Sequence, residues 1–369
     1  MISRAKLHLP RPSASLLQAR SANRSTAIQI WIIGAIGPLI LLLMGPYGQY
    51  DFAAFWVAGK QALAGGAANI YSTEATKYYA DSLGLGGPTI FPYPPHALFL
   101  FVPFALIPYI PSYLVWNLVS AVAFYWAAKP YLPERFPPIL SVLTPAGITC
   151  LDFGQTGLIF GALWLWAFRG RWAAIAVMTF KPHLGILSIL SLKSRSALFK
   201  TCAVGAALIG ASILLFGIML WLGFVEHSMS HGARLTMMKR WLFAGVGPAI
   251  GYGLWGWVPF AAAGALMLAR KVNVFTAATA SFLVSPYAFH YDMTVAALGF
   301  GLLIFRHWDA MPVHHRTALA LGFLTPAIAN TGTWWVPPLL LWGLWTQVQY
   351  DYETSPDGWF ASKRPRLKV

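Results

Sequence analysis

Acidic residues are scarce in this chain, which has 11 Asp and Glu among 369 residues against 26 Lys and Arg. Charged residues of either sign make up 10% of the sequence, whereas 57% is hydrophobic. So little polar surface is not enough to solvate a globule of this size. The composition therefore excludes a soluble enzyme, a nucleic-acid binder and a disordered chain, and it predicts an integral membrane protein surrounded by the lipid bilayer.

Cysteine and the common nucleotide motifs are also lacking. Cys150 and Cys202 lie in or beside apolar segments, which excludes a disulfide framework and a cysteine-based metal site. The sequence has no D-x-D pair, no G-x-G-x-x-G and no G-x-x-x-x-G-K-[ST]. Glu226, His227 and His231 have a spacing that zinc can use but not the H-E-x-x-H order. We therefore expect neither a metal nor another cofactor.

Basic residues at the two ends of the chain predict its topology. The first 26 residues contain five Lys or Arg and no acid, and the apolar run 27–44 follows them. The positive-inside rule places the tails 1–26 and 350–369 in the cytoplasm, with residues 27–349 between them as one transmembrane domain. A signal peptide is the alternative for the first run, but no A-x-A-like cleavage site follows it. We expect a multi-pass protein of the cell membrane.

Residues 46–95 form the longest stretch without a spanning segment, and they would lie outside the cytoplasm if the first helix spans. Within this loop, residues 51–64 predict an amphipathic helix that lies in the membrane interface. Its apolar face would consist of Phe52, Phe55, Trp56, Gly59 and Leu63. Residues 73–83 predict a second, more polar helix.

Apolar segments follow one another closely from residue 96 onward. We therefore expect an all-α polytopic bundle of roughly 10–12 membrane segments, several of them short or broken. The segments cover about 96–110, 112–128, 137–150, 154–168, 172–192, 198–224, 246–269, 273–305, 314–328 and 333–349.

Three polar breaks interrupt these segments, at LDFGQTG (151–157), at Lys181-Pro182 and at Ser285-Pro286. The two arms of 172–192 are each about half as long as the hydrocarbon core is thick, so this segment could enter and leave by the same face. Non-helical backbone at membrane depth is stable only where it is buried in protein or lines an aqueous cavity. The breaks therefore predict an internal polar site.

Asp51, Asp152, Glu226 and Asp292 lie in or beside apolar segments, and carboxylates at such positions are candidates for function. For Asp51 the structural alternative is the N-cap of the helix that it begins. Lys181 would suit a bound phosphate, and the alternative is a structural pair with Asp152 or Asp292.

Histidines and basic residues near the breaks give further candidates. His183 could face an anionic ligand or be a hydrogen-bonded interior histidine. His290, Tyr291 and Asp292 fall within one turn; alternatively Pro286 only kinks the chain and Asp292 caps the next segment. A basic group in an expected external loop could attract phosphate, and it consists of Arg234, Lys239 and Arg240.

Five motifs in order resemble one family, the DUF2029 group or glycosyltransferase family 87, over about residues 40–310. They are DFAAFWVAG at 51–59, FPYPPHALFLFVPF at 91–104, GQT at 154–156, FKPHL at 180–184 and SPY with YD at 285–292. The resemblance implies a GT-C fold and transfer of a glycosyl group from a polyprenyl-phosphate carrier to a lipid or glycan acceptor on the extracytoplasmic side. The characterised members are mycobacterial α-1,2-mannosyltransferases, which implies a mannose-type hexose, with a pentose as the alternative.

The resemblance also implies that Asp51 is the catalytic base. Mannosyltransferase members have a histidine in the later break, where this chain reads Tyr291-Asp292 after His290. We assign the donor phosphate to Lys181, His183, His290, Arg234, Lys239 and Arg240. We assign substrate contacts to Tyr93, His96, Gln155, Tyr291 and Asp292.

The scarcity of acids agrees with this chemistry. Polyprenyl phosphate leaves without a general acid, so one carboxylate base and a few cationic groups suffice, and a single displacement inverts the anomeric carbon. A transporter or flippase of a lipid-linked or small polar substrate is the alternative, because transporters also use broken helices. Transporters usually have two related halves, and no second copy of the Asp51 loop is found.

Overall fold

The computed structural model describes residues 14–44, 49–84, 91–134, 136–237, 245–328 and 334–352; side chains are described in these ranges except at 14–24, 41, 44, 49, 50 and 230–237. The described chain is helical, with no strand and a single antiparallel bridge between Gly245 and Phe289. The expected all-α membrane fold is thereby confirmed.

Three helices in the described part of the chain are long and apolar enough to cross a membrane. The first is Tyr109–Tyr131, which includes α5 (Tyr109–Ala128). The other two are α10 (Arg195–Phe216) and α12 (Pro248–Arg270). Shorter apolar helices occupy much of the remainder, including Ser25–Ile40 within α1 (Ala14–Met44). A helix rises about 1.5 Å per residue, so the apolar helices of 10–12 residues are shorter than a core of about 30 Å, whereas the 31 residues of α1 are enough to cross it.

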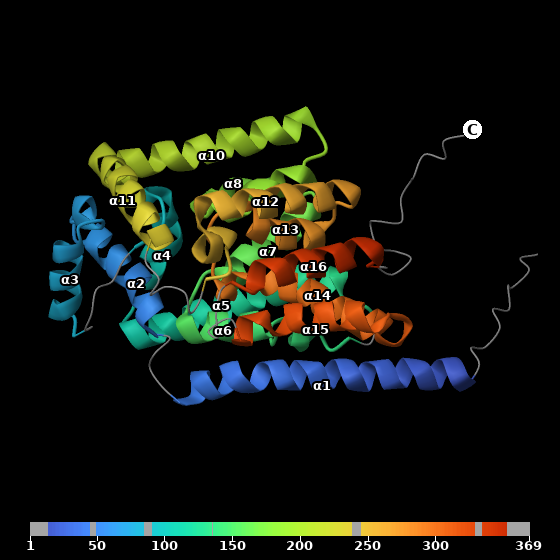
Figure 1. The fold of residues 1–369 in the computed structure, drawn as a ribbon. Helices are drawn as coiled ribbons and strands as arrows, with labels where there is room; N and C mark the ends of the chain where they lie inside the picture. Colours follow the sequence, from blue (N-terminus) through green and yellow to red (C-terminus); the bar gives the residue numbers. More distant parts are fainter. Residues whose placement is uncertain are drawn as a thin grey trace, which may run out of the picture.

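The helices form a bundle with a distinct cluster at one end (Figure 1). Helix α1 lies along one edge of the bundle and α10 along the opposite edge. Between them lie α5, α7 (Gly157–Phe168), α12, α13 (Val274–Val284), α14 (Thr294–His307), α15 (Val313–Ile328) and α16 (Val336–Gln349). The end cluster consists of α2 (Gln49–Leu63), α3 (Thr73–Ser82), α4 (Leu98–Ala105) and α11 (Ile218–Met237).

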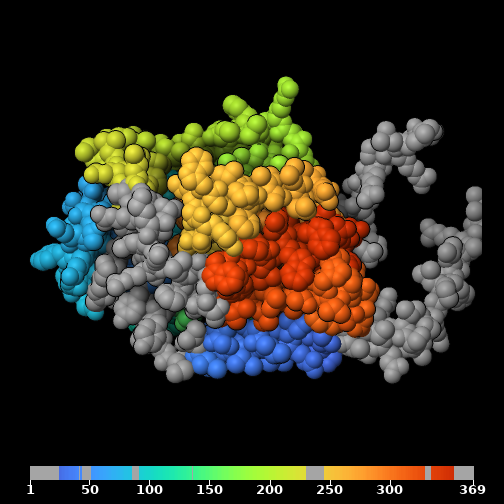
Figure 2. Space-filling model, in the orientation of Figure 1, coloured from blue at the N-terminus to red at the C-terminus, as the bar shows by residue number. Residues whose placement is uncertain are grey.

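The centre of the bundle is built from helices that are apolar on every side. All residues of 274–283 in α13 and of 294–305 in α14 are buried, as expected for helices without a polar face. Figure 2 shows α12, α15 and α16 covering this core on one face, with α1 below them and α10 above.

Helix α2 differs from the expected interfacial helix. Residues 52–59 are all buried, and α2 packs against α4, α5 and α6 (Pro145–Phe153). Phe55 stacks on Phe101 with ring centroids 4.6 Å apart, and a Cβ on Gly59 would come within 2.7 Å of the Ala105 Cβ. The expectation of a single apolar face is therefore wrong, because residues 52–59 are buried on every side of the helix, while its place in the membrane interface stays a prediction. The second helix of the loop, α3, is confirmed.

The apolar segment expected at 198–224 is divided into two helices. Helix α10 ends at Phe216 and α11 begins at Ile218, with Gly217 between them at φ 86°. A residue with a side chain is strained in this left-handed conformation, so glycine permits the sharp change of direction. The division lets α10 stay at the edge of the bundle while α11 joins the end cluster.

All three expected breaks are confirmed. The first separates α6 (Pro145–Phe153) from α7. The second separates α8 (Trp172–Val177) and η6 (Met178–Phe180) from α9 (Pro182–Gly185) and η7 (Ile186–Ser191). The third separates α13 from η9 (His290–Asp292) and α14. Further short 3-10 helices are η2 (Ala67–Asn69), η3 (Pro95–Ala97), η4 (Lys129–Tyr131), η5 (Pro138–Ser141) and η10 (Trp308–Ala310).

The contact between α1 and α14 gives a prediction about stability. A Cβ on Gly301 would collide with the indole of Trp31, which is 2% exposed and donates to the Leu140 carbonyl at 2.9 Å. Gly301→Ala should therefore destabilise the fold by about 1–3 kcal/mol, as overpacking does. Gly210→Ala is the matched control, since no atom lies within 4 Å of its Cβ position in α10. Thermal unfolding of the detergent-purified variants compares them; equal melting temperatures would contradict this docking of α1.

Candidate active site

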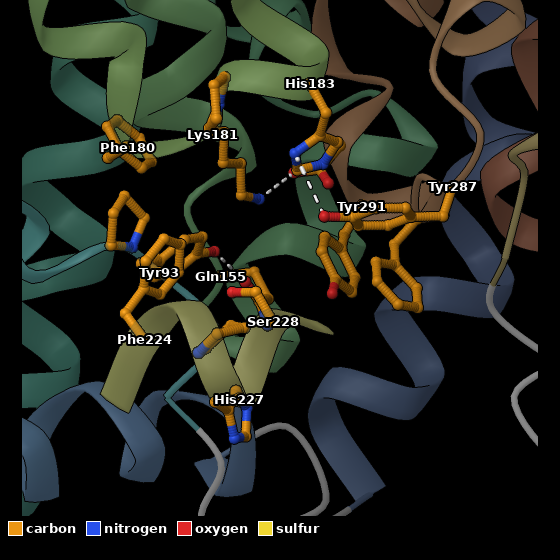
Figure 3. A pocket seen from close by; sticks show the side chains of 15 residues that line it. Tyr93, Gln155, Phe180, Lys181, His183, Phe224, His227, Ser228, Tyr287 and Tyr291 are labelled. Carbon is orange, nitrogen blue, oxygen red and sulfur yellow. Dashed lines mark hydrogen bonds and ion pairs between the residues drawn. The ribbon is translucent and has the colours of Figure 1, made fainter. Parts of the chain in front are cut away.

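The three breaks meet at one cavity of about 160 Å³ beside the end cluster. In Figure 3 side chains from widely separated segments converge on it, with Lys181 and His183 on one side and His227 and Ser228 on the other. Its walls are mainly aromatic. The lining residues are Pro92, Tyr93, Pro94, Gln155, Phe180, Lys181, Pro182, His183, Phe224, His227, Ser228, Tyr287, Phe289, Tyr291 and Asp292.

A buried ion pair forms one wall of the cavity. The Lys181 Nζ lies 2.6 Å from the Asp292 Oδ1, and the two residues are 4% and 7% exposed. Aromatic rings surround the ammonium group at 5.3, 6.0 and 5.7 Å, and they belong to Tyr93, Phe160 and Tyr291. Of the two structural partners that the sequence left open for Lys181, the structure thus selects Asp292. The cap alternative for Asp292 is wrong, since Met293 takes the N-cap position of α14.

A second carboxylate, Asp51, is linked to the cavity through Gln155. Gln155 Nε2 donates to the Asp51 Oδ2 at 3.0 Å. At the other end of the amide, the Tyr93 hydroxyl donates to Gln155 Oε1 at 3.4 Å and shares a hydrogen bond of 2.8 Å with the Thr156 hydroxyl. Gln155 and Tyr93 line the cavity, whereas Asp51 is not among the lining residues.

Asp51 lies in the first turn of α2, which begins at Gln49, so it follows the N-cap position rather than occupying it. Its side chain is half-buried. Burial raises the pKa of Asp51, while the Gln155 hydrogen bond and the charge of Lys181 lower it and only partly offset the burial. Asp152 lies near it, and burial together with the charge of Asp51 raises the pKa of Asp152 to about 6.

The backbone around Gln155 is held by side chains of α5. Gly154 ends α6 in the left-handed conformation at φ 61°, and a Cβ there would come within 2.7 Å of the Phe52 Cβ. The Trp116 indole donates to the Gly154 carbonyl at 2.9 Å, and the Tyr113 hydroxyl donates to the Leu151 carbonyl at 2.7 Å. The first bond gives the Gly154 carbonyl a partner, and the second adds to the bond that the Leu151 carbonyl accepts from the Gly154 N–H, so the break is stable inside the bundle.

The other predicted site residues divide into three groups. His183 and Tyr291 line the cavity, and the His183 ring stacks on Tyr287 with centroids 4.4 Å apart. His96 and His290 are buried but are not among the lining residues: His96 Nε2 lies 3.1 Å from the Thr179 hydroxyl, and His290 packs edge-on against Phe153. Three further residues were predicted to bind phosphate, but their side chains lie outside the part of the chain that the structure describes: Arg234, Lys239 and Arg240.

Helix α11 supplies lining residues that the sequence did not assign to a substrate. Phe224, His227 and Ser228 reach the cavity from α11, and the His227 ring lies 5.6 Å from that of Tyr71. His227 was considered only as part of a zinc-like spacing. The available signal was Gly217, because a glycine in the middle of an apolar run permits a change of direction. Among the described residues, no group of three or more His, Cys, Asp or Glu is placed to hold a metal ion.

Comparison with known families gives one match. The model of glycosyltransferase family 87 matches residues 91–286, more than half of the chain. This range includes Tyr93, Gln155 and Lys181 and ends before Asp292, while Asp51 precedes it. No curated protein and no solved structure matches the chain.

The ion pair in the cavity wall gives a second prediction. Lys181→Met leaves the Asp292 carboxylate buried without its partner and should destabilise the protein by about 3–5 kcal/mol. The double variant Lys181→Met/Asp292→Leu should recover most of this loss, since it buries no charge.

The Lys271–Asp351 pair offers a matched control. It has the same distance of 2.6 Å, but its two side chains are 25% and 74% exposed. Lys271→Met should cost at most about 1 kcal/mol. Thermal unfolding in detergent measures all three variants. Equal losses for Lys181→Met and the double variant would show that an unpaired Asp292 charge is not the cause of the destabilisation.

Proposed function

Because the chain belongs to glycosyltransferase family 87, we propose that it moves one glycosyl group from a polyprenyl-phosphate donor to a lipid or glycan acceptor. The proposed place is the extracytoplasmic face of the cell membrane, with both termini in the cytoplasm and a GT-C type of architecture. The observation that carries this proposal is the cavity with its Lys181–Asp292 pair, connected through Gln155 to the half-buried carboxylate of Asp51. Membership of a glycosyltransferase family favours transfer over transport.

The donor sugar, a mannose-type hexose or a pentose, would occupy the aromatic cavity. Tyr93, Tyr287 and Tyr291 offer flat faces and hydroxyl groups there, which suits a ring with apolar and polar edges. We assign the donor phosphate to Lys181 and His183, whose side chains line the cavity. We also assign phosphate contacts to His290, Arg234, Lys239 and Arg240.

In the proposed reaction, the acceptor hydroxyl oxygen attacks the anomeric carbon from the Asp51 side. The new C–O bond forms while the bond from that carbon to the phosphate oxygen breaks. The hydroxyl proton passes to the Asp51 carboxylate, and polyprenyl phosphate leaves with the electron pair. Lys181 stabilises the charge that develops on the phosphate, so no general acid is required. A single displacement of this kind inverts the anomeric configuration.

Asp51→Asn tests the proposed base. Asn keeps the shape of Asp and can still accept a hydrogen bond, but it does not take a proton. The variant should fold like the wild type and lose on the order of 10²–10⁴ in turnover. The assay measures transfer from polyprenyl-phosphate mannose by the protein in lipid nanodiscs, with products identified by mass spectrometry. Near-normal transfer by Asp51→Asn would remove this residue from the mechanism.

Metal dependence provides an independent test. Lys and His side chains, rather than a metal ion, hold the phosphate in the proposed site, so transfer should persist in EDTA. The measurement is the transfer rate of protein dialysed against EDTA, before and after addition of Mg²⁺ or Mn²⁺. A rate that is lost in EDTA and restored by either ion would refute this assignment of the phosphate site.

A further inference from the structure

We infer that Gln155 is a positioning residue that orients the Asp51 carboxylate toward the acceptor, an inference that rests on the proposed function. Gln155 is 6% exposed, and it lies at the boundary between the donor cavity and Asp51. Transfer must join an atom in the cavity to an oxygen beside Asp51. The side chain of Gln155 lines the cavity and contacts Asp51, so its conformation determines how the Asp51 carboxylate is oriented.

The amide of Gln155 is fixed in one orientation. Its oxygen receives the Tyr93 hydroxyl and the Thr156 backbone N–H, each at 3.4 Å. An amide has its oxygen at one end and its NH₂ group at the other, so this arrangement directs the NH₂ group to Asp51. Tyr93 is itself held by aromatic contacts, with the ring of Phe55 at 5.3 Å and that of Phe101 at 5.9 Å.

The backbone of Gln155 is fixed as well. Its N–H donates to the Cys150 carbonyl at 2.9 Å, and its carbonyl accepts from the Cys150 thiol at 3.1 Å. The left-handed Gly154 directly before it turns the chain out of α6. Gln155 is thus held at its main chain and at its amide oxygen, and only its NH₂ group is left to act on another residue.

The consequence falls on Asp51. The NH₂ group occupies the Oδ2, which leaves the Oδ1 to receive the acceptor proton. A donor at one oxygen also stabilises the ionised form that a base requires. Three other ionisable groups are coupled to this site electrostatically: the charge of Lys181 favours ionisation of Asp51, and the charge of Asp51 disfavours ionisation of Asp152 on α6 and of the Tyr291 phenol.

The test is a pH profile of kcat/KM for Gln155→Met and Gln155→Glu, measured by transfer from polyprenyl-phosphate mannose in nanodiscs. Met removes the donor, and Glu replaces it with a second acid beside Asp51. In both variants Asp51 should bind its proton more tightly, so the acid limb of the profile should move to higher pH by about one unit or more. Turnover near neutral pH should fall about tenfold and partly recover as the pH is raised.

Gln61→Met is the matched control, since Gln61 is buried on the same helix as Asp51 but is not among the residues that line the cavity. The acid limb of the kcat/KM profile of Gln61→Met should lie at the same pH as that of the wild type. If Gln155→Met does not fold, Gln155→Glu still carries the test, because it keeps the shape of the side chain and an acceptor for Tyr93.

A double variant separates positioning from a merely structural role. If Gln155 acts through Asp51, Asp51→Asn/Gln155→Met should be no slower than Asp51→Asn alone, within about twofold. The inference would be overturned if the acid limb did not shift, or if the double variant lost activity by the product of the two single losses. In either case, a slow Asp51→Asn would still support the proposed base. Full activity of Asp51→Asn, or no transfer by the wild type from polyprenyl-phosphate mannose or a polyprenyl-phosphate pentose, would instead overturn the proposed function.

Discussion

A helix that stops inside an apolar bundle leaves carbonyl groups without partners, and in this protein neighbouring side chains supply those partners. Indole groups do so twice: Trp116 donates to the Gly154 carbonyl, and Trp257 donates to the Leu283 and Val284 carbonyls, all at 2.9–3.1 Å. The Thr294 hydroxyl of α14 also donates to the Gly157 carbonyl at 2.8 Å, in the first turn of α7 after the break. An unsatisfied polar group costs several kcal/mol in hydrocarbon, so the breaks and the site between them depend on these bonds.

Satisfied breaks explain how a chain with so few acids builds a polar cavity. Each break brings a short polar sequence to the same cavity: Gln155 at the first, Lys181 and His183 at the second, Asp292 at the third. The surrounding helices remain apolar and fully packed. The functional groups are therefore concentrated in one place instead of being spread over many helices, and family 87 membership agrees with a site of this kind.

Much of this arrangement could be predicted from the sequence, because polar residues inside long apolar runs are conspicuous. The sequence predicted all three breaks and the helix α3, and it offered the pairing of Lys181 with Asp152 or Asp292 as the structural alternative to phosphate binding. Helix α2 was misjudged, since helical spacing alone does not distinguish a half-buried face from burial on all sides. The contribution of α11 depends on a turn at Gly217, and the hydrogen bond from Gln155 to Asp51 joins residues 104 apart. Neither contact leaves a periodic signal in the sequence.

The ion pair in the cavity also constrains the order in which the protein is assembled. Lys181 and Asp292 are 111 residues apart, so the ribosome releases the lysine long before its partner exists. An unpaired ammonium group is unstable deep in a bilayer. Lys181 therefore reaches its stable place in the cavity wall only after η9, which contains Asp292, has been synthesised. The site is completed only when the third break has been synthesised and Asp292 can pair with Lys181. A protein truncated before residue 292 would retain the Lys181 charge without its partner.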